Sequence, residues 1–417
     1  MHRPHTTRSH GRTAGLLALG ALVAACGGAP EEPPAAASTA TAYQNARLIT
    51  GTGAVIENAT FVVDGGRFVA VGVTGDVEVP TGAAVEDLSS MTVMPAMVDA
   101  HTHMSTTREA LVEDLEFRAY FGVGGVLSMG ADGEGAPLEV RDEVLPGAAR
   151  YASAGLGITR PEPGRNEVHW VDTADEARAA VQAEAARGVD IVKIWVDDRN
   201  GQYEKMTPEL YGAVIDEAHQ AGIRVAAHIF ALEDAKGLAD AGLDVFAHGV
   251  RDMDVDDAFI RQVTGDDVVL IPNMPSRGVP TDLSWLSGVV AAEQFAGLQT
   301  GNVENPDAQA SWSIQARNLA AMHAAGVTVA LGTDGNTPWA AHIEMEDMVA
   351  AGMPPTDVLV AATRNAAAVA GFDDMGTVAP GMSADFVVLS ANPLDDITNT
   401  RQITGVYLRG TAIDRAQ

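Results

Sequence analysis

Two histidines separated by one residue, His101 and His103, follow an apolar run that begins at Met94 and includes Met97 and Val98. The run predicts a short buried strand, and side chains two positions apart in a strand point the same way. Two imidazoles side by side at a strand end can bind one metal ion. Because such a pair is weak evidence alone, the interpretation depends on what the fold places beside it.

Four more residues that can bind a metal ion end or interrupt short apolar runs further along the chain. In chain order they are Lys193, His228, His248 and Asp334. Each run has the length and composition of a buried strand that ends in a polar loop. If these strands are neighbours in one sheet, all six side chains meet at the same edge. The sequence therefore predicts a metal site with six candidate ligands.

Lys193 is the unusual member of this group, because it lies inside the apolar run 189–196. Strand alternation places it on the same side as Ile191 and Trp195. Burying an ammonium there without a counter-ion costs several kcal/mol, and burial lowers the pKa of a lysine. A neutral amine can add carbon dioxide and become a carbamate, whose two oxygens can bridge two divalent cations. The alternative is an interior lysine paired with a carboxylate such as Asp334.

Asp334 can bind one ion and also accept a proton from a water that bridges the two ions. Two cations lower the pKa of that water from about 16 toward about 7, so that hydroxide forms near neutral pH. We therefore expect two divalent ions, zinc in the first place and manganese or cobalt as alternatives. A hydrolytic reaction follows, with Asp334 as its general base and acid.

The middle of the chain, residues 95–375, alternates short apolar runs with alanine-rich helical stretches such as 173–187, 208–221 and 314–325. Several helices end before a glycine (Gly188, Gly222 and Gly326), as expected of helix C-termini. Eight such units predict an α/β fold, a (β/α)₈ TIM barrel whose chemistry lies in the loops after the strands. The predicted strands are 96–100, 125–128, 150–154, 190–196, 224–227, 244–247, 268–272 and 328–331.

The two ends of the predicted mature chain have a different texture, with short alternating runs in 42–94 and again in 376–417. Asp64-Gly65-Gly66 between two of the runs predicts a hairpin turn. Strands at both ends that flank a different middle predict one small β-sandwich domain, built from the two chain ends.

The first 25 residues have the composition of a bacterial lipoprotein signal peptide, with a basic start and an apolar stretch too short to span a bilayer. Cys26, the only cysteine, is the expected site of lipidation, and an ordinary cleaved signal is the alternative. Residues 26–41 then read as a flexible tether. We expect an exported protein, lipid-anchored on the periplasmic side of the envelope. The net charge of −30 argues against nucleic acid or anionic lipid as a partner.

Several further segments match the same known pattern as the six candidate ligands. They are Val63–Arg67, Met94–His103, Gly332–Asp334, Ala362–Ala367, Gly376–Gly381 and Asn392–Asp396. Together they resemble the amidohydrolase superfamily, in particular its imidazolonepropionase-like and Xaa-Pro dipeptidase (prolidase)-like metal hydrolases. The resemblance implies one ion on His101, His103 and Asp334. It implies a second ion on His228 and His248, with carbamylated Lys193 between the two.

The segment after Lys193 departs from that pattern. Many dipeptidase-like members have a Ser-Gly-Gly-type loop there, whereas this chain has Trp195-Val196-Asp197-Asp198-Arg199. A narrow dipeptidase specificity therefore does not carry over. Four residues are weaker candidates for substrate binding: Tyr203, Arg251, His169 and His342.

We expect hydrolysis of an amide C–N bond in a small-molecule or short-peptide substrate of the dipeptide, Xaa-Pro or N-acyl amino-acid type. A lactone, ester or organophosphate hydrolase on the same site is the first alternative. A ligand-binding lipoprotein that has lost catalysis is the second. Whether the chain forms a homo-oligomer stays open at this level.

Overall fold

The structure is a computed structural model that describes residues 38–415. The predicted signal peptide, Cys26 and most of the predicted tether lie outside the described residues. In the described part, no helix combines the length and the apolar composition that crossing a membrane requires.

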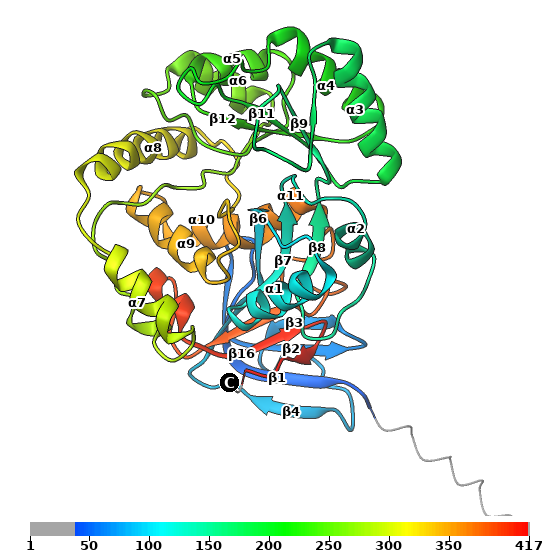
Figure 1. Cartoon of the computed structure of the whole chain (residues 1–417). Helices are drawn as coiled ribbons and strands as arrows, with labels where there is room; N and C mark the ends of the chain where they lie inside the picture. Colours follow the sequence, from blue (N-terminus) through cyan, green and yellow to red (C-terminus); the bar gives the residue numbers. More distant parts are fainter. Residues whose placement is uncertain (1–37, 416–417) are drawn as a thin grey trace, which may run out of the picture. The chain divides into compact units, whose positions relative to one another are not determined.

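The two chain ends build one mixed sheet of eight strands (Figure 1). Its strands are β1 (Thr41–Ile49), β2 (Val55–Asp64), β3 (Arg67–Val73), β4 (Ala84–Asp87), β5 (Thr92–Pro95), β15 (Phe386–Leu389), β16 (Ile403–Leu408) and β17 (Thr411–Ala412). The order β17-β16-β15-β5-β1-β2-β3, with β4 beside β1, interleaves both ends. The predicted β domain from both ends is thus confirmed as one hydrogen-bonded sheet.

This sheet curls around an aromatic core. The Phe386 ring stacks on Tyr407 with centroids 4.4 Å apart, and meets Tyr43 and Phe61 edge-on at 5.2 Å each. The hairpin between β2 and β3 turns at two glycines with positive φ, 55° and 78°. Those angles fit a type I′ turn, as Asp64-Gly65-Gly66 predicted.

Parallel strands form the barrel. They are β6 (Met97–Thr102), β7 (Val123–Ser128), β8 (Arg150–Ser153), β11 (Val192–Val196), β12 (Val225–Ile229), β13 (Val245–Phe246) and β14 (Val269–Leu270). The eighth predicted strand, 328–331, is present as bridging hydrogen bonds rather than as a regular strand. Ala330 N donates to Leu270 O and Ala100 N donates to Leu331 O, each at 2.9 Å, so this segment joins β14 to β6. Asp190 N donates to Ser153 O at 2.9 Å and joins β8 to the β11 segment.

Two short strands that the sequence did not reveal follow β8: β9 (Gly157–Thr159) and β10 (Val168–Trp170). The helices are α1 (Arg108–Tyr120), α2 (Ala136–Arg141), α3 (Ala174–Arg187), α4 (Pro208–Gln220), α5 (Leu232–Asp240), α6 (Asp257–Gly265), α7 (Ala292–Gly301), α8 (Pro306–Ala324), α9 (Ala340–Ala350), α10 (Pro355–Val360) and α11 (Ala366–Ala370). A π-helical turn, Ala361–Asn365, joins the last two.

Helices α3, α4 and α8 end as predicted, each before a glycine with positive φ. In all three, the residue after the glycine donates its N–H to a carbonyl five residues back, for example Ile223 to Ala218. This pattern satisfies carbonyls that the end of a helix leaves free.

Small apolar side chains fill the barrel interior. The buried inner cluster includes Val98 and Ala100 from β6, Ile191, Ala226 and Ala247. A bulge then interrupts β6: Asp99 pairs with Val126 of β7, whereas Thr102 pairs with Ser128, so β6 carries one extra residue. Such an extra residue reverses the alternation of the side chains that follow it. This reversal turns the two histidines after the bulge inward.

Candidate metal centre

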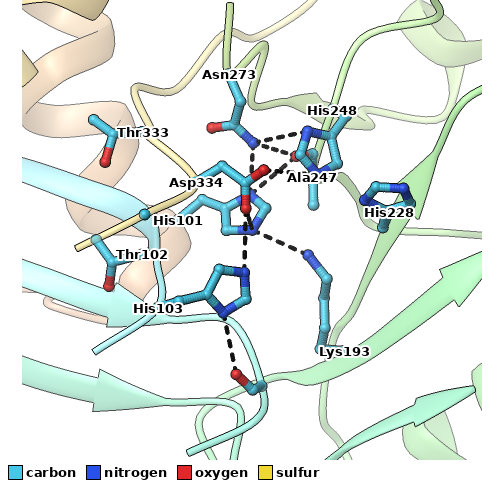
Figure 2. A network of polar contacts seen from close by, with 12 residues as sticks. His101, Thr102, His103, Lys193, His228, Ala247, His248, Asn273, Thr333 and Asp334 are labelled. Atoms are coloured by element: carbon cyan, nitrogen blue, oxygen red, sulfur yellow. Dashed lines mark hydrogen bonds and ion pairs between the residues drawn. The ribbon is translucent and has the colours of Figure 1, made fainter. Parts of the chain in front are cut away.

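Three of the six predicted ligands lie together where β6 and the 328–331 segment end (Figure 2). One donor atom each from His101, His103 and Asp334 lies within 4.8 Å of the others. Asp334 Oδ1 is 3.2 Å from Nε2 of His101 and 3.1 Å from Nε2 of His103. His101 is fully buried, whereas the side chains of His103 and Asp334 are 34% and 37% exposed. The three donors therefore converge at a point that a small molecule can reach.

The protonation of His103 shows that this group suits a cation. Its Nδ1 lies 3.2 Å from the carbonyl oxygen of Gly130, which only accepts hydrogen bonds, so Nδ1 carries the proton. Release of a proton from Nε2 would leave this nitrogen and the Asp334 carboxylate oxygen, 3.1 Å away, as two donors for one divalent cation.

Lys193 reaches into the same place from β11 (Figure 2). It is fully buried, and its Nζ lies 3.2 Å from Nε2 of His101. Burial, followed by the charges of Arg165 and Arg251, lowers the pKa of Lys193 to about 7 even though Asp334 opposes the shift. A substantial share of neutral amine is therefore present at neutral pH, as carbamate formation requires.

His228 and His248 lie beside each other with ring centroids 4.4 Å apart, and the His248 ring is 5.0 Å from that of His101. His248 Nε2 lies 3.7 Å from Oδ2 of Asp334. Each of the two rings also has a contact outside the predicted group of six. His228 Nε2 donates to Asp197 Oδ2 at 3.1 Å, and the Arg251 guanidinium touches His248 Nδ1.

Electrostatics keep these rings in the form that binds metals. Burial, then the charge of Lys193, lowers the pKa of His101 to about 3, and burial lowers the pKa of His228 to about 4. Burial would raise the pKa of Asp334, but its contacts with the imidazoles outweigh burial and hold that pKa below its usual range. Neutral imidazoles and an ionised carboxylate are the ligand forms that metal binding needs.

A buried ion pair fixes the two chain segments that carry the first three donors. Asp99 and Arg118 are both inaccessible to solvent, and Arg118 Nη1 donates to Asp99 Oδ2 at 2.9 Å. The same carboxylate accepts from the hydroxyl of Thr333 at 2.7 Å and from its backbone N–H at 3.1 Å. Arg118 Nη2 donates to the carbonyl oxygen of Gly335 at 2.8 Å. Thus α1, β6 and the loop around Asp334 are tied at one point.

Two further residues shape the space around His101. Asn273 lies three residues after the end of β14. Its side-chain nitrogen is 2.6 Å from His101 Nδ1 and contacts the carbonyl oxygen of Ala247 (Figure 2). Gly332 leaves room for this packing. A Cβ there would lie 2.5 Å from Ile271 Cγ2 and 2.7 Å from His101 Cβ, closer than real contacts allow.

Of the four weaker candidates for substrate binding, one lies at the site and three lie apart from it. Arg251 touches His248 and so belongs to the site. The structure does not bring His342 there: it is buried on α9, with Nδ1 2.9 Å from the Thr400 hydroxyl and Nε2 2.9 Å from the Phe121 carbonyl oxygen. With both nitrogens engaged, it has no free atom for a substrate.

His169 and Tyr203 also lie apart from the ligands. His169 is on β10, the edge strand beside β9, where its Nε2 lies 2.7 Å from Glu184 Oε1 of α3. Tyr203 lines a surface hollow of about 620 Å³ together with Arg160 and Lys205, and none of the six predicted ligands lines it.

Sequence reasoning missed Asn273, Arg118 and the contact between Asp197 and His228. Asn273 had a usable signal, because it is a polar residue directly after the predicted strand 268–272. The predicted ligands occupy the same kind of position, at the ends of their own strands. Arg118 had none, since a single arginine on a helix does not reveal its tertiary partner.

Comparisons with known proteins agree with this arrangement. An uncharacterized protein of Mycobacterium tuberculosis is 30% identical over 278 residues, 62% of this chain and 68% of that protein. An ochratoxinase of Aspergillus niger is 26% identical over 258 residues, covering 58% of this chain and 50% of the relative. An imidazolonepropionase of Cereibacter sphaeroides is 27% identical over 380 residues, 83% of this chain and 91% of the relative.

Among solved structures, a candidate prolidase from Bifidobacterium longum superposes with a TM-score of 0.74 at 27% identity, covering 90% of this chain and 94% of the other. These likenesses confirm the predicted barrel and its imidazolonepropionase- and prolidase-like character. The sequence profile of the amidohydrolase family matches residues 92–413, which include every predicted ligand. The chain belongs to the amidohydrolase family.

Proposed function

We propose that this protein is a metal-dependent hydrolase that cleaves an amide C–N bond in a substrate with a nearby carboxylate, such as a dipeptide or an N-acyl amino acid. The observation that carries the proposal is the convergence of His101, His103 and Asp334 at the strand ends of an amidohydrolase barrel. The prolidase-like and ochratoxinase relatives support amide chemistry in particular.

His101, His103 and Asp334 would hold one divalent ion. His228 and His248 would hold a second, with Lys193 as its carbamate between them. Bound ions of this kind polarise a carbonyl and lower the pKa of a water toward about 7. The chain itself supplies neutral imidazoles, an ionised carboxylate and an amine whose pKa is near 7.

Asp334 would move the proton. Its Oδ1 faces His101 and His103, whereas its Oδ2 lies farther from its nearest imidazole, 3.7 Å from His248 Nε2. Oδ2 is thus the oxygen available to accept a proton from the attacking water. Because the side chain is 37% exposed, the same oxygen can deliver that proton to the leaving amine.

Arg251 would bind the substrate carboxylate. Among the described residues it forms no ion pair, and its Nε is buried without a hydrogen-bond partner. The guanidinium is partly buried and touches His248 Nδ1, so it can bind an anionic group of a substrate held beside that ring. This places the recognised carboxylate next to the amide that is cleaved.

The experiment is a substrate panel with added zinc or manganese: Xaa-Pro dipeptides, N-acyl amino acids, lactones and phosphotriesters. We expect amine release from the first two groups. Asp334→Asn should abolish turnover with the fold retained. Arg251→Met should raise KM about 10- to 100-fold for a substrate with a free carboxylate, which is the loss of about 1.5–3 kcal/mol. The matched carboxamide substrate should show no such change.

Turnover confined to lactones or phosphotriesters would refute the amide assignment, and tight binding without any turnover would refute catalysis. We also propose lipid anchoring through Cys26, supported by the N-terminal sequence alone. Labelled palmitate should enter the wild-type protein and not Cys26→Ser; equal labelling of both would refute the anchor.

A further inference from the structure

We propose that Asp197 is an additional ligand of the second cation, and that the guanidinium of Arg199 competes with this cation for the Asp197 carboxylate. The inference rests on the two-ion site of the proposed function. It concerns the segment after Lys193 that departs from the dipeptidase-like pattern.

Asp197 is the first residue after β11, the strand that carries Lys193. Its side chain is 10% exposed, and its Oδ2 lies 3.1 Å from Nε2 of His228. This carboxylate therefore stands beside the atom that His228 would offer to the second ion.

The two atoms are joined by a hydrogen bond in this structure, and their spacing also fits two donors on one ion. Zinc–nitrogen and zinc–oxygen distances of about 2.0–2.2 Å place two donors about 2.9–3.4 Å apart, depending on the angle between them. The same spacing recurs in the first group of donors, where Asp334 Oδ1 lies 3.1 Å from His103 Nε2. Asp197 and His228 thus form a pair that matches the candidate three-donor cluster in distance and in ligand type.

A cation already touches both atoms of this pair. Arg199 Nη1 lies 2.8 Å from Asp197 Oδ2 and 3.5 Å from His228 Nε2. Arg199 also has a second acidic partner, because its Nε donates to Glu162 Oε1 at 3.2 Å. When an ion binds Asp197, the guanidinium keeps this partner and is not left unpaired.

The balance of charge around the second ion favours an additional anionic ligand. Among the six predicted ligands only Asp334 is a carboxylate, while Lys193, Arg199 and Arg251 bring positive charge close to His228 and His248. A second divalent ion here needs another anion. Asp197 supplies one that does not depend on carbon dioxide, so the second ion can bind before Lys193 is carbamylated.

Three consequences follow for the binding of metal ions. The second equivalent of Zn²⁺ binds more weakly than the first, since it displaces a guanidinium. Asp197→Asn, which is nearly isosteric, weakens the second equivalent at least tenfold and leaves the first unchanged. Arg199→Gln strengthens the second equivalent, because the competing cation is gone.

The test is a titration of the metal-free full-length protein with Zn²⁺ against a chromophoric chelator, with bound metal counted by elemental analysis. Asp198→Asn is the matched control. It removes the same charge from the adjacent residue, whose carboxylate accepts from Gly201 N at 2.9 Å. We expect two equivalents with unchanged affinities in this control.

A direct readout of ligation is Asp197→Cys loaded with Co²⁺. A thiolate bound to cobalt gives a charge-transfer absorption in the near ultraviolet, which a merely supporting residue would not give. Wild-type protein with its single Cys26 is the blank.

The proposal is overturned by a wild-type protein that takes no second equivalent, by Asp197→Asn binding two ions with wild-type affinity, or by absence of the cobalt–thiolate band. None of these readouts uses turnover. A protein that binds two ions through Asp197 but hydrolyses no amide would refute the proposed function and leave this inference standing.

Discussion

The buried pair of Asp99 and Arg118 allows a prediction with a magnitude. Arg118→Met keeps the length of the side chain and removes its charge. The Asp99 carboxylate then loses its only ionic partner among the described residues, and the carbonyl oxygen of Gly335 loses a donor. Breaking one side of a fully buried pair costs about 3–5 kcal/mol, since a buried charge stays uncompensated. That loss is a large fraction of a typical folding free energy of about 5–15 kcal/mol.

Urea denaturation of the metal-free protein, followed by circular dichroism, measures this loss. With a slope of about 3 kcal/mol per M urea, the midpoint should fall by about 1 to 1.7 M. Arg108→Met on the same helix is the matched control. Arg108 pairs with Glu143 at the surface, where the two side chains are 42% and 38% exposed. The control should therefore shift the midpoint far less than Arg118→Met.

The pH dependence gives a second check on the same variant. Burial raises the pKa of Asp99 above its usual value, while Arg118 opposes the rise. Without Arg118 the pKa of Asp99 rises further, so Asp99 takes up a proton in the folded state at a higher pH than in the unfolded state. The stability that the variant lacks above this raised pKa is therefore regained as the pH falls through it. The deficit of Arg118→Met should thus shrink from pH 7 to pH 5. A deficit that is constant with pH, or no larger than that of Arg108→Met, would refute the reasoning.

Two further predictions concern the packing around the site, and a third concerns the buried His342, which lies apart from it. Gly332→Ala should lower stability by about 1–3 kcal/mol and weaken the first Zn²⁺ equivalent, because the new methyl group overlaps its neighbours. Gly335→Ala, where a Cβ meets open space, is the control, and equal melting temperatures for both variants would contradict the prediction. Asn273→Ala should weaken the first equivalent about 10- to 100-fold in the chelator titration, and unchanged affinity would rule out its supporting role. Burial lowers the pKa of His342 to about 3, so between about pH 6.5 and 4 the unfolded state binds a proton that the folded state does not. This residue alone therefore contributes a stability loss of up to about 1.4 kcal/mol per pH unit as the pH falls. His342→Gln should flatten this slope without changing KM, whereas the exposed-site control His219→Gln should keep it; a raised KM in His342→Gln would restore a role in substrate binding.

The sequence alone determined most of the barrel and sheet elements and the residue types that end them. Apolar runs of strand length, glycines after three helices and the turn Asp64-Gly65-Gly66 are local signals, and local signals are legible in one chain. They were enough to predict the barrel, the β domain from both ends and the convergence of three metal-binding residues at strand ends, namely His101, His103 and Asp334.

Only the tertiary structure decided the details that depend on contacts between distant segments. The bulge in β6, which turns the two histidines inward after an outward Asp99, shows only in the pairing with β7. The Arg118–Asp99 pair joins residues nineteen positions apart through packing that no periodicity encodes. His342 and Arg251 looked equally suitable in the sequence, yet burial against Thr400 and Phe121 separates the first from the site, while the second touches His248. Side-chain direction and burial arise from the packed fold as a whole, and a residue's type alone does not specify them.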